Sequence, residues 1–314
     1  MIEIKKIKII FMGTPEFSVP ILNALIEDYK VIAVVTQLDK KVGRKQVLTP
    51  SPIKKIALTN KIDVLQPEKI SGNAEFIRRV NDLKPDLIVI AAYGLILPKE
   101  ILDIPKYRVI NVHASLLPKY RGASPIQSAI LNGDKETGVT IMLVNEKMDE
   151  GDILMQKTIT ITDDDNFASL YDKLSILGTH LLIETLPKWL NKEIKLQKQD
   201  DSQATYCKLI TKEDGKIDWH KSAIEIERQV CALNPWPGTW TVWDDKKVKL
   251  LKVKLLNGLN KNSAGMVFKT NEDFAISCNE ESLEILELQL EGKKPMSAKE
   301  FLNGYPKIIG SVLK

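Results

Sequence analysis

Asn111 and His113 are the two residues whose types and spacing most clearly indicate chemistry. They lie two positions apart at the end of the apolar run 108–113, and in a strand this spacing points both side chains to the same side. An amide beside an imidazole can donate hydrogen bonds to a developing oxyanion, and the imidazole can also transfer a proton. A lone histidine at a strand end is more often structural, but the amide two positions earlier favours the chemical interpretation.

Apolar runs that alternate with amphipathic segments predict the elements that position this pair. Strands are expected over residues 7–12, 31–36, 63–65, 86–91, 108–112, 138–144 and 153–161. Helices are expected over residues 16–28, 51–60 and 73–83, from Ser124 onward, and over 166–190. This alternation predicts an α/β fold with a doubly wound, mostly parallel sheet. Its ligand pocket would lie beyond the carboxyl ends of the strands, where Asn111 and His113 fall.

The pattern changes after residue 190. Residues 191–206 are polar and lack a steady apolar period, which predicts a linker between a domain at 1–190 and a second domain at 207–314. In the second domain a helix is expected over 224–233, followed by short strands over 239–243, 248–255, 265–268, 274–278 and 283–290. Several short strands separated by turns predict a small β-barrel. The alternation of lysines changes parity at Leu250 and Leu251, which predicts a β-bulge.

Composition excludes several classes of protein. A chain of 314 residues with 44% hydrophobic and 27% charged residues is globular, and a net charge of +4 is too small for wholesale coating of nucleic acid. Cys207, Cys231 and Cys278 have no C-x-x-C spacing, so neither disulfides nor a metal site is expected, and a reducing, cytoplasmic location fits. No apolar stretch reaches the roughly 20 residues of a membrane span.

Residues 13–16 lack the glycines of a dinucleotide-binding loop, which argues against a nicotinamide enzyme.

Eight short motifs match one protein family. They are Phe11-Met-Gly-Thr-Pro-Glu-Phe17, Thr36-Gln37, Thr49-Pro-Ser-Pro52, Ala92-Tyr-Gly-Leu-Ile-Leu-Pro98, Asn111-Val-His113, Ser115-Leu-Leu-Pro118, Gly138-Val-Thr-Ile-Met142 and Asn234-Pro-Trp-Pro237. Together they resemble the methionyl-tRNA formyltransferase family over nearly the whole chain. The resemblance implies an N-terminal catalytic domain and a C-terminal OB-like β-barrel that helps to hold tRNA. It also implies formyl transfer from 10-formyltetrahydrofolate, a cosubstrate that is not tightly bound, to the amino group of methionine on initiator tRNA.

The resemblance implies a catalytic role for three residues. Asn111 and His113 would donate hydrogen bonds to the oxygen of a tetrahedral intermediate, and the imidazole would help to pass the amine proton to the departing folate nitrogen. Asp149 would hold the ring in the useful tautomer and stabilise its charged form. Without the resemblance, Asp149 is most simply a turn residue.

The resemblance also implies residues that bind the two substrates. The segment expected to contact folate, through backbone groups and apolar side chains, consists of Ser115, Leu116, Leu117 and Pro118. Arg44 lies in a basic loop and would contact the acceptor end of the tRNA. This loop departs from the family pattern at Leu38 and at residues 45–47.

The sequence is also compatible with three other functions. The nearest keeps the chemistry and changes the acceptor to glycinamide ribonucleotide or an amino sugar, although those families resemble only the first domain. A formyltetrahydrofolate hydrolase would use the same three catalytic residues and would need no tRNA-binding barrel. An inactive nucleic-acid-binding module would have no use for Asn111, His113 and Asp149 together. The chain is expected to be a monomer.

Two features of the second domain also have alternative interpretations. The lysines of residues 246–254 form either a second phosphate-binding face or a solvated strand edge that opposes aggregation. Trp236, Trp240 and Trp243 are expected to pack within the domain rather than to stack on bases.

Overall fold

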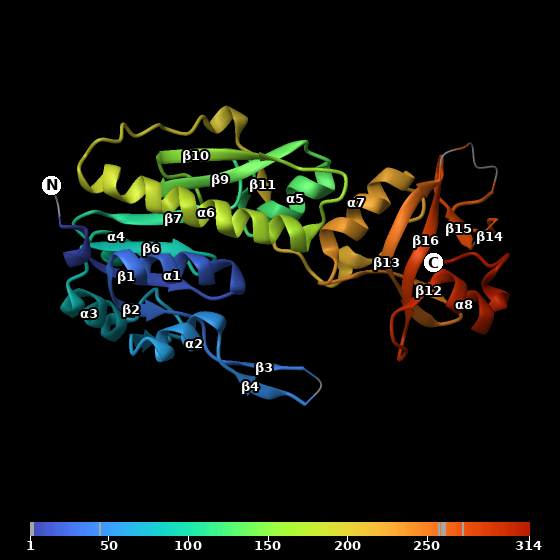
Figure 1. Ribbon diagram of the computed structural model, residues 1–314, viewed down its shortest axis with the longest axis horizontal. Helices are drawn as coiled ribbons and strands as arrows, with labels where there is room; N and C mark the ends of the chain where they lie inside the picture. The colour runs from blue at the N-terminus through green and yellow to red at the C-terminus, as the bar shows by residue number, and fades with distance from the viewer. Residues whose placement is uncertain (1–2, 44, 257, 259–261, 272) are drawn as a thin grey trace. The chain divides into compact units, whose positions relative to one another are not determined.

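The computed structural model divides the chain into two compact units (Figure 1). It describes residues 3–43, 45–256, 258, 262–271 and 273–314. The first unit comprises residues up to 125 together with 136–160 and 171–208, and the second comprises 126–135, 161–170 and 209–314. The domain limits expected from sequence, at residues 190 and 207, remain a prediction.

A seven-stranded sheet forms the centre of the first unit, with strand order β10-β9-β7-β6-β1-β2-β5. Its strands are β1 (Lys8–Gly13), β2 (Lys30–Val35), β5 (Asp63–Leu65), β6 (Leu87–Ala91), β7 (Val109–His113), β9 (Glu136–Leu143) and β10 (Ile153–Thr160). The five strands β7, β6, β1, β2 and β5 pair in parallel in this spatial order, whereas β9 pairs antiparallel with both β7 and β10. The sheet is therefore mixed and mainly parallel, as the alternation of elements predicts.

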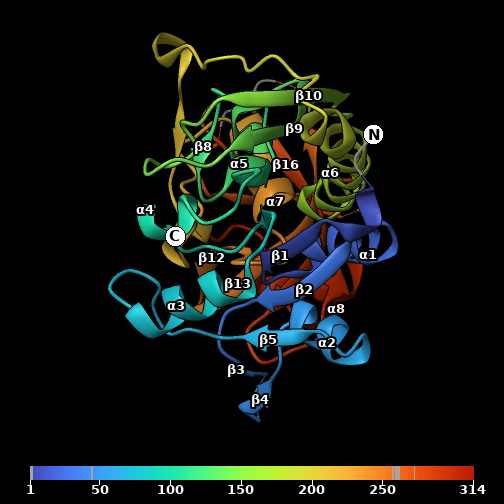
Figure 2. The same cartoon turned by 90° about the vertical axis from the view of Figure 1, so that its left-hand side faces the viewer.

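Helices lie on both faces of this sheet. They are α1 (Val19–Asp28), α2 (Pro52–Thr59), α3 (Ala74–Leu83), α4 (Lys99–Leu102) and α6 (Phe167–Leu190). Figure 2 shows α1 and α6 on one side of the sheet and α3 and α4 on the other. Ile10 of β1 and Ile88 of β6 share one buried cluster with Phe76 of α3 and Ile101 of α4. Both faces are covered, which explains why the central strands are continuous apolar runs.

The alternation of side chains along β7 decides where the predicted catalytic pair lies. Val109 belongs to the buried cluster on the α3 and α4 side. Val112 faces α6, since a Cβ atom added to Gly178 of that helix would lie 2.9 Å from Val112 Cγ1. Asn111 and His113 share the parity of Val109, so both side chains point away from α6.

Two pairs of very short strands were not expected from the sequence. β3 (Lys40–Val42) and β4 (Val47–Thr49) form an antiparallel hairpin, where the sequence indicates only a basic loop. β8 (Arg121–Gly122) pairs in parallel with β11 (Tyr206–Cys207). Each of these four strands has only two or three residues, too few to set a hydrophobic period by themselves.

An antiparallel sheet dominates the second unit, with strand order β12-β13-β16-β15-β14 and β17 beside β16. Its strands are β12 (Thr239–Trp243), β13 (Lys246–Leu256), β14 (Val267–Lys269), β15 (Phe274–Ser277), β16 (Ser282–Leu290) and β17 (Met296–Ser297). The register between β13 and β16 steps from Leu250 to Lys252 and skips Leu251. The predicted β-bulge is therefore confirmed.

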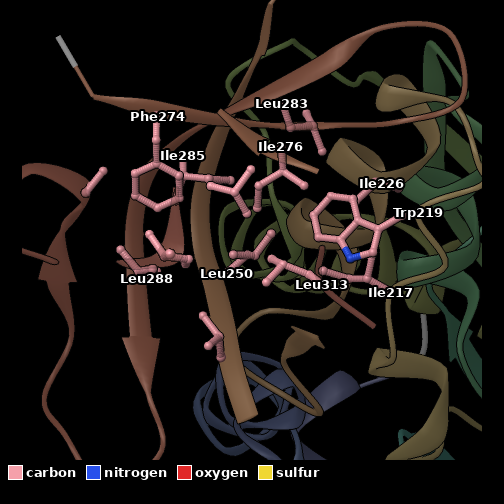
Figure 3. Packing of buried hydrophobic residues seen from close by; sticks show 14 of the residues in the cluster. Ile217, Trp219, Ile226, Leu250, Phe274, Ile276, Leu283, Ile285, Leu288 and Leu313 are labelled. Atoms are coloured by element: carbon pink, nitrogen blue, oxygen red, sulfur yellow. The ribbon is translucent and has the colours of Figure 1, made fainter. Parts of the chain in front are cut away.

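One apolar cluster holds the second unit together (Figure 3). Leu250 of β13, Phe274 of β15 and Ile285 of β16 are fully buried in it. Trp219 is 4% exposed, and its indole Nε1 donates to Thr241 Oγ1 at 3.0 Å. The polar atom of the largest side chain in this core is thus hydrogen-bonded, which removes the cost of burying it.

The helices of the second unit are α5 (Pro125–Asn132), α7 (Ala223–Leu233) and α8 (Ala298–Gly304). A capping box starts α7 at Ser222 and another starts α8 at Ser297, each with a glutamate three residues later. Within the described ranges of the chain, no helix combines the length and the apolar character needed to cross a membrane.

Candidate active site

Asp149 lies beside the predicted pair Asn111 and His113. Asn111 Nδ2 donates to Asp149 Oδ1 at 3.5 Å, and His113 Nδ1 lies 3.7 Å from Asp149 Oδ2. The side chains of His113 and Asp149 are 6% and 16% exposed. The structure thus brings the three residues with predicted catalytic roles together, on the face of β7 that points away from α6.

The second ring nitrogen of His113 contacts the backbone. His113 Nε2 lies 3.0 Å from the carbonyl oxygen of Tyr120. Because a carbonyl oxygen can only accept, this contact assigns a proton to Nε2. Nδ1 then faces Asp149 with a lone pair in the neutral ring and with an N–H in the charged ring. Nδ1 is therefore the ring nitrogen that faces the Asp149 carboxylate.

The backbone of Gly122 fixes the carboxylate of Asp149. The Gly122 N–H donates to Asp149 Oδ2 at 2.8 Å. Gly122 has a φ of +119°, and a Cβ atom there would lie 2.3 Å from the carbonyl oxygen of Cys207. Both the conformation and the close approach of β11 therefore require glycine at this position.

The predicted folate-contacting loop is held by hydrogen bonds of its own. Leu117 N–H donates to Thr140 Oγ1 at 3.1 Å, and this hydroxyl donates to the carbonyl oxygen of Ser115 at 2.7 Å. Ser115 and Leu117 are buried, whereas Leu116 and Pro118 are half-buried. Leu116 and Pro118 therefore supply the accessible side-chain surface of this loop.

An open pocket of about 370 Å³ is lined by the segment that leads into Asp149. Its lining consists of residues 144–147 together with Leu102 and three charged residues, Lys99, Asp103 and Arg108. The loop residues 115–118 are absent from its lining. The predicted folate loop and this pocket are therefore distinct features of the first unit.

The predicted tRNA-contacting residue, Arg44, falls between β3 and β4 and lies outside the described residues. The chain just before this hairpin is anchored at Asp39, which accepts hydrogen bonds from Lys54 Nζ at 2.8 and 2.9 Å and from Gln66 Nε2 at 2.9 Å. These bonds lower the pKa of the Asp39 carboxyl. In the hairpin itself, Leu48 is 63% exposed.

Two side chains near Asp149, Arg121 and Gln199, are not among the site residues that the sequence predicts. Arg121 is 1% exposed and paired with Asp201 at 2.6 Å. Gln199 Nε2 donates to the carbonyl oxygens of Asp149 and Gly151 at 2.8 and 2.7 Å. No local signal marks Gln199, because it lies in a polar segment without periodicity.

The tryptophans of the second unit differ in exposure. Trp243 packs against the rings of Phe301 and Tyr305, with centroids 5.8 and 6.0 Å away. Trp240 is 9% exposed, and Lys247 Nζ lies 3.8 Å from its ring centroid. The packing expected for these two is confirmed, but it is wrong for Trp236, which is 53% exposed in its proline-flanked segment.

Comparisons with known proteins place the whole chain in one family. The family described as formyl transferase matches residues 5–186, and the formyl transferase C-terminal domain matches residues 209–306. Methionyl-tRNA formyltransferase of Caldanaerobacter subterraneus subsp. tengcongensis is 47% identical over 308 residues, which cover 98% of this chain and 100% of that protein. Methionyl-tRNA formyltransferase of Halalkalibacterium halodurans is 49% identical over 311 residues, 98% of each chain.

Solved structures with the same fold have lower identity. The sugar 3N-formyl transferase WlaRD, crystallised with dTDP and 5-N-formyl-THF, is 23% identical with a TM-score of 0.67, covering 92% of this chain and 99% of that one. HypX from Aquifex aeolicus, in complex with tetrahydrofolic acid, is 17% identical with a TM-score of 0.61, covering 96% of this chain and 48% of that one. The chain belongs to the methionyl-tRNA formyltransferase family.

Proposed function

We propose that this protein transfers the formyl group of 10-formyltetrahydrofolate to the amino group of methionine esterified to initiator tRNA, for translation initiation. The observation that carries the proposal is the contact of Asn111 and His113 with Asp149, at 3.5 and 3.7 Å. The full-length identity of 47–49% to proteins named methionyl-tRNA formyltransferase supports this choice of acceptor.

The three side chains suit the steps of this transfer. The neutral amine attacks the formyl carbon, a C–N bond forms, and the carbonyl oxygen gains negative charge that Asn111 Nδ2 can stabilise. The bond from that carbon to the folate nitrogen then breaks, and the amine proton passes to that nitrogen. His113 moves this proton through Nδ1, and Asp149 stabilises the ring while it is charged.

The folate would lie against the half-buried side chains of Leu116 and Pro118, in the loop that begins at Ser115. Both backbone groups of Leu117 accept or donate within the protein: its N–H is bonded to Thr140 and its carbonyl oxygen to Gln156. The loop therefore offers a preorganised apolar wall, which suits the flat pterin of a cosubstrate that binds and leaves in each turnover.

For the tRNA, the proposal assigns the phosphate contact to Arg44 and to exposed lysines. Lys246, Lys247 and Lys254 lie exposed along β13. Positive side chains release counterions from a phosphate backbone when they bind it. We further propose that the first domain is doubly wound and Rossmann-like, that the second is an OB-like barrel, and that the protein is a cytoplasmic monomer.

The acceptor is tested by offering the purified protein 10-formyltetrahydrofolate with each candidate in turn. We expect formylation of charged initiator tRNA and no comparable product with glycinamide ribonucleotide or an amino sugar. Faster transfer to either small acceptor would contradict the proposal. Release of formate without any acceptor would indicate a hydrolase instead.

A further inference from the structure

Asp149 adopts a backbone conformation that needs support from its neighbours. Its φ is +55°, in the left-handed region. A residue other than glycine stays in this region only where the surrounding structure holds it there. The direction of the Asp149 carboxylate, and thus its contact with His113, therefore depends on whatever fixes this backbone.

Gln199 contacts the backbone of Asp149 directly. Its Nε2 donates to the Asp149 carbonyl oxygen at 2.8 Å and to the Gly151 carbonyl oxygen at 2.7 Å. One amide therefore bridges two carbonyl groups of the same turn, and both of its donor hydrogens are used. This bridge holds the two carbonyl groups in a fixed relation.

Arg121 in turn holds Gln199. Arg121 Nε donates to Gln199 Oε1 at 3.0 Å, and its terminal nitrogens donate to Asp201 at 2.6 Å and to the Tyr206 hydroxyl at 3.2 Å. The next residue, Gly122, donates its N–H to the Asp149 carboxylate. Asp149 is thus held at its backbone through Gln199 and at its carboxylate through Gly122, and Arg121 joins the two supports.

We infer that Gln199 is a positioning residue for Asp149, an inference that rests on the proposed function. Gln199 acts through the backbone of the turn, because both hydrogen bonds that it donates go to backbone carbonyl groups. The polar segment 191–206, which the sequence predicts as a linker, thereby contributes to the catalytic geometry. Loss of the amide donors should loosen the carboxylate behind His113 and slow the chemical step.

Two variants separate the bonds that Gln199 makes. Gln199→Met keeps the length of the side chain and removes every hydrogen bond. Gln199→Glu keeps an acceptor for Arg121 and removes the two bonds donated to the Asp149 turn. The matched control is Gln203→Ala, because Gln203 lies in the same segment with an exposed side chain that donates to Asp200.

We expect both Gln199 variants to lower kcat, by up to about 100-fold as for a misplaced catalytic group, with the KM for folate and tRNA unchanged. Gln203→Ala should match the wild type. An unchanged kcat, or a rise in KM alone, would overturn the inference. These outcomes require an active wild type, whereas a wild type that does not formylate methionyl-tRNA would overturn the proposed function itself.

A double-mutant cycle with Asp149→Asn distinguishes positioning from a general loss of structure. If Gln199 acts through Asp149, Gln199→Met should cause no further loss of kcat in the Asp149→Asn background. If Gln199→Met lowered kcat by the same factor in both backgrounds, the two residues would act independently, and the inference would be overturned. Thermal unfolding of each variant is measured alongside, and Gln199→Glu replaces Gln199→Met in the cycle if the latter does not fold.

Discussion

His113 Nε2 lies 3.0 Å from the carbonyl oxygen of Tyr120, so the backbone holds one side of the ring while Asp149 faces the other. The resemblance to known enzymes implies that Asp149 sets the tautomer of His113. In the structure the Tyr120 carbonyl group makes the shorter contact and assigns the Nε2 proton. We therefore propose that Asp149 stabilises the charged ring and that the transferred proton passes through Nδ1.

Replacement of His113 tests the proton transfer. His113→Ala should lower kcat by about 10² to 10⁴-fold, the range for removal of a general acid or base. The KM for both substrates should change little, because the ring acts mainly in the transition state. Steady-state kinetics with charged initiator tRNA measure both constants. Turnover close to that of the wild type would remove His113 from the mechanism.

Gly122→Ala tests the link between β8 and the carboxylate. The added Cβ would meet the Cys207 carbonyl oxygen at a φ of +119°, so we expect a loss of more than about 1 kcal/mol in unfolding free energy and a lower kcat. Gly72→Ala is the matched control, since Gly72 also has a positive φ but no atom within 4 Å of the added Cβ. Urea denaturation and kcat are measured for both. Equal kcat values in the two variants would argue against the role of the Gly122 N–H.

Arg44→Ala tests the tRNA contact. The variant should raise the KM for tRNA, leave folate binding intact, and reduce the slope of log affinity against log salt by about 1. Arg79→Ala serves as the control, because Arg79 is exposed and paired with Asp63. tRNA binding is measured at several salt concentrations. If the affinity of the wild type for tRNA did not depend on salt, the protein would not bind the phosphate backbone of the tRNA through positive side chains.

Ser222→Ala tests the capping of α7. Ser222 Oγ accepts from Glu225 N–H, and Glu225 in turn accepts from the Ser222 backbone. Loss of the N-cap should cost about 1 kcal/mol of stability. Ser202→Ala, in a short surface turn, is the control, since its exposed hydroxyl donates to Asp200. Calorimetry should show a lower Tm for Ser222→Ala alone, and a Tm equal to the control would contradict the capping role.

The sequence predicts best the elements whose side chains repeat over several residues. β7 and α6 lie within two residues of their expected limits, since their apolar patterns are long enough to set the period. The β-bulge at Leu251 could be predicted because lysines mark the solvent-facing positions of a half-exposed strand. A change in their alternation therefore marks the extra residue. The two-residue spacing of Asn111 and His113 likewise predicts that their side chains point to the same face of the sheet.

The contacts that hold Asp149 could not be predicted in this way. The Gly122 N–H and the Tyr120 carbonyl group are backbone groups, so no residue type in the sequence marks them. Their positions are set by a turn and a two-residue strand. The segment that carries Gln199 is held beside Asp149 by the bridge between Gln197 and Ile153 and by the pairing of β11 with β8. Such long-range pairings follow from tertiary packing and have no local signature.

The most direct measurement is a single-turnover assay with 10-formyltetrahydrofolate labelled in its formyl carbon and charged initiator tRNA, using the wild type and Asp149→Asn. We expect the wild type to move the label to the methionine amino group. We expect Asp149→Asn to do so much more slowly at saturating substrate. Label that stays on folate with the wild type, or equal rates for the two proteins, would show that Asp149 does not serve this transfer.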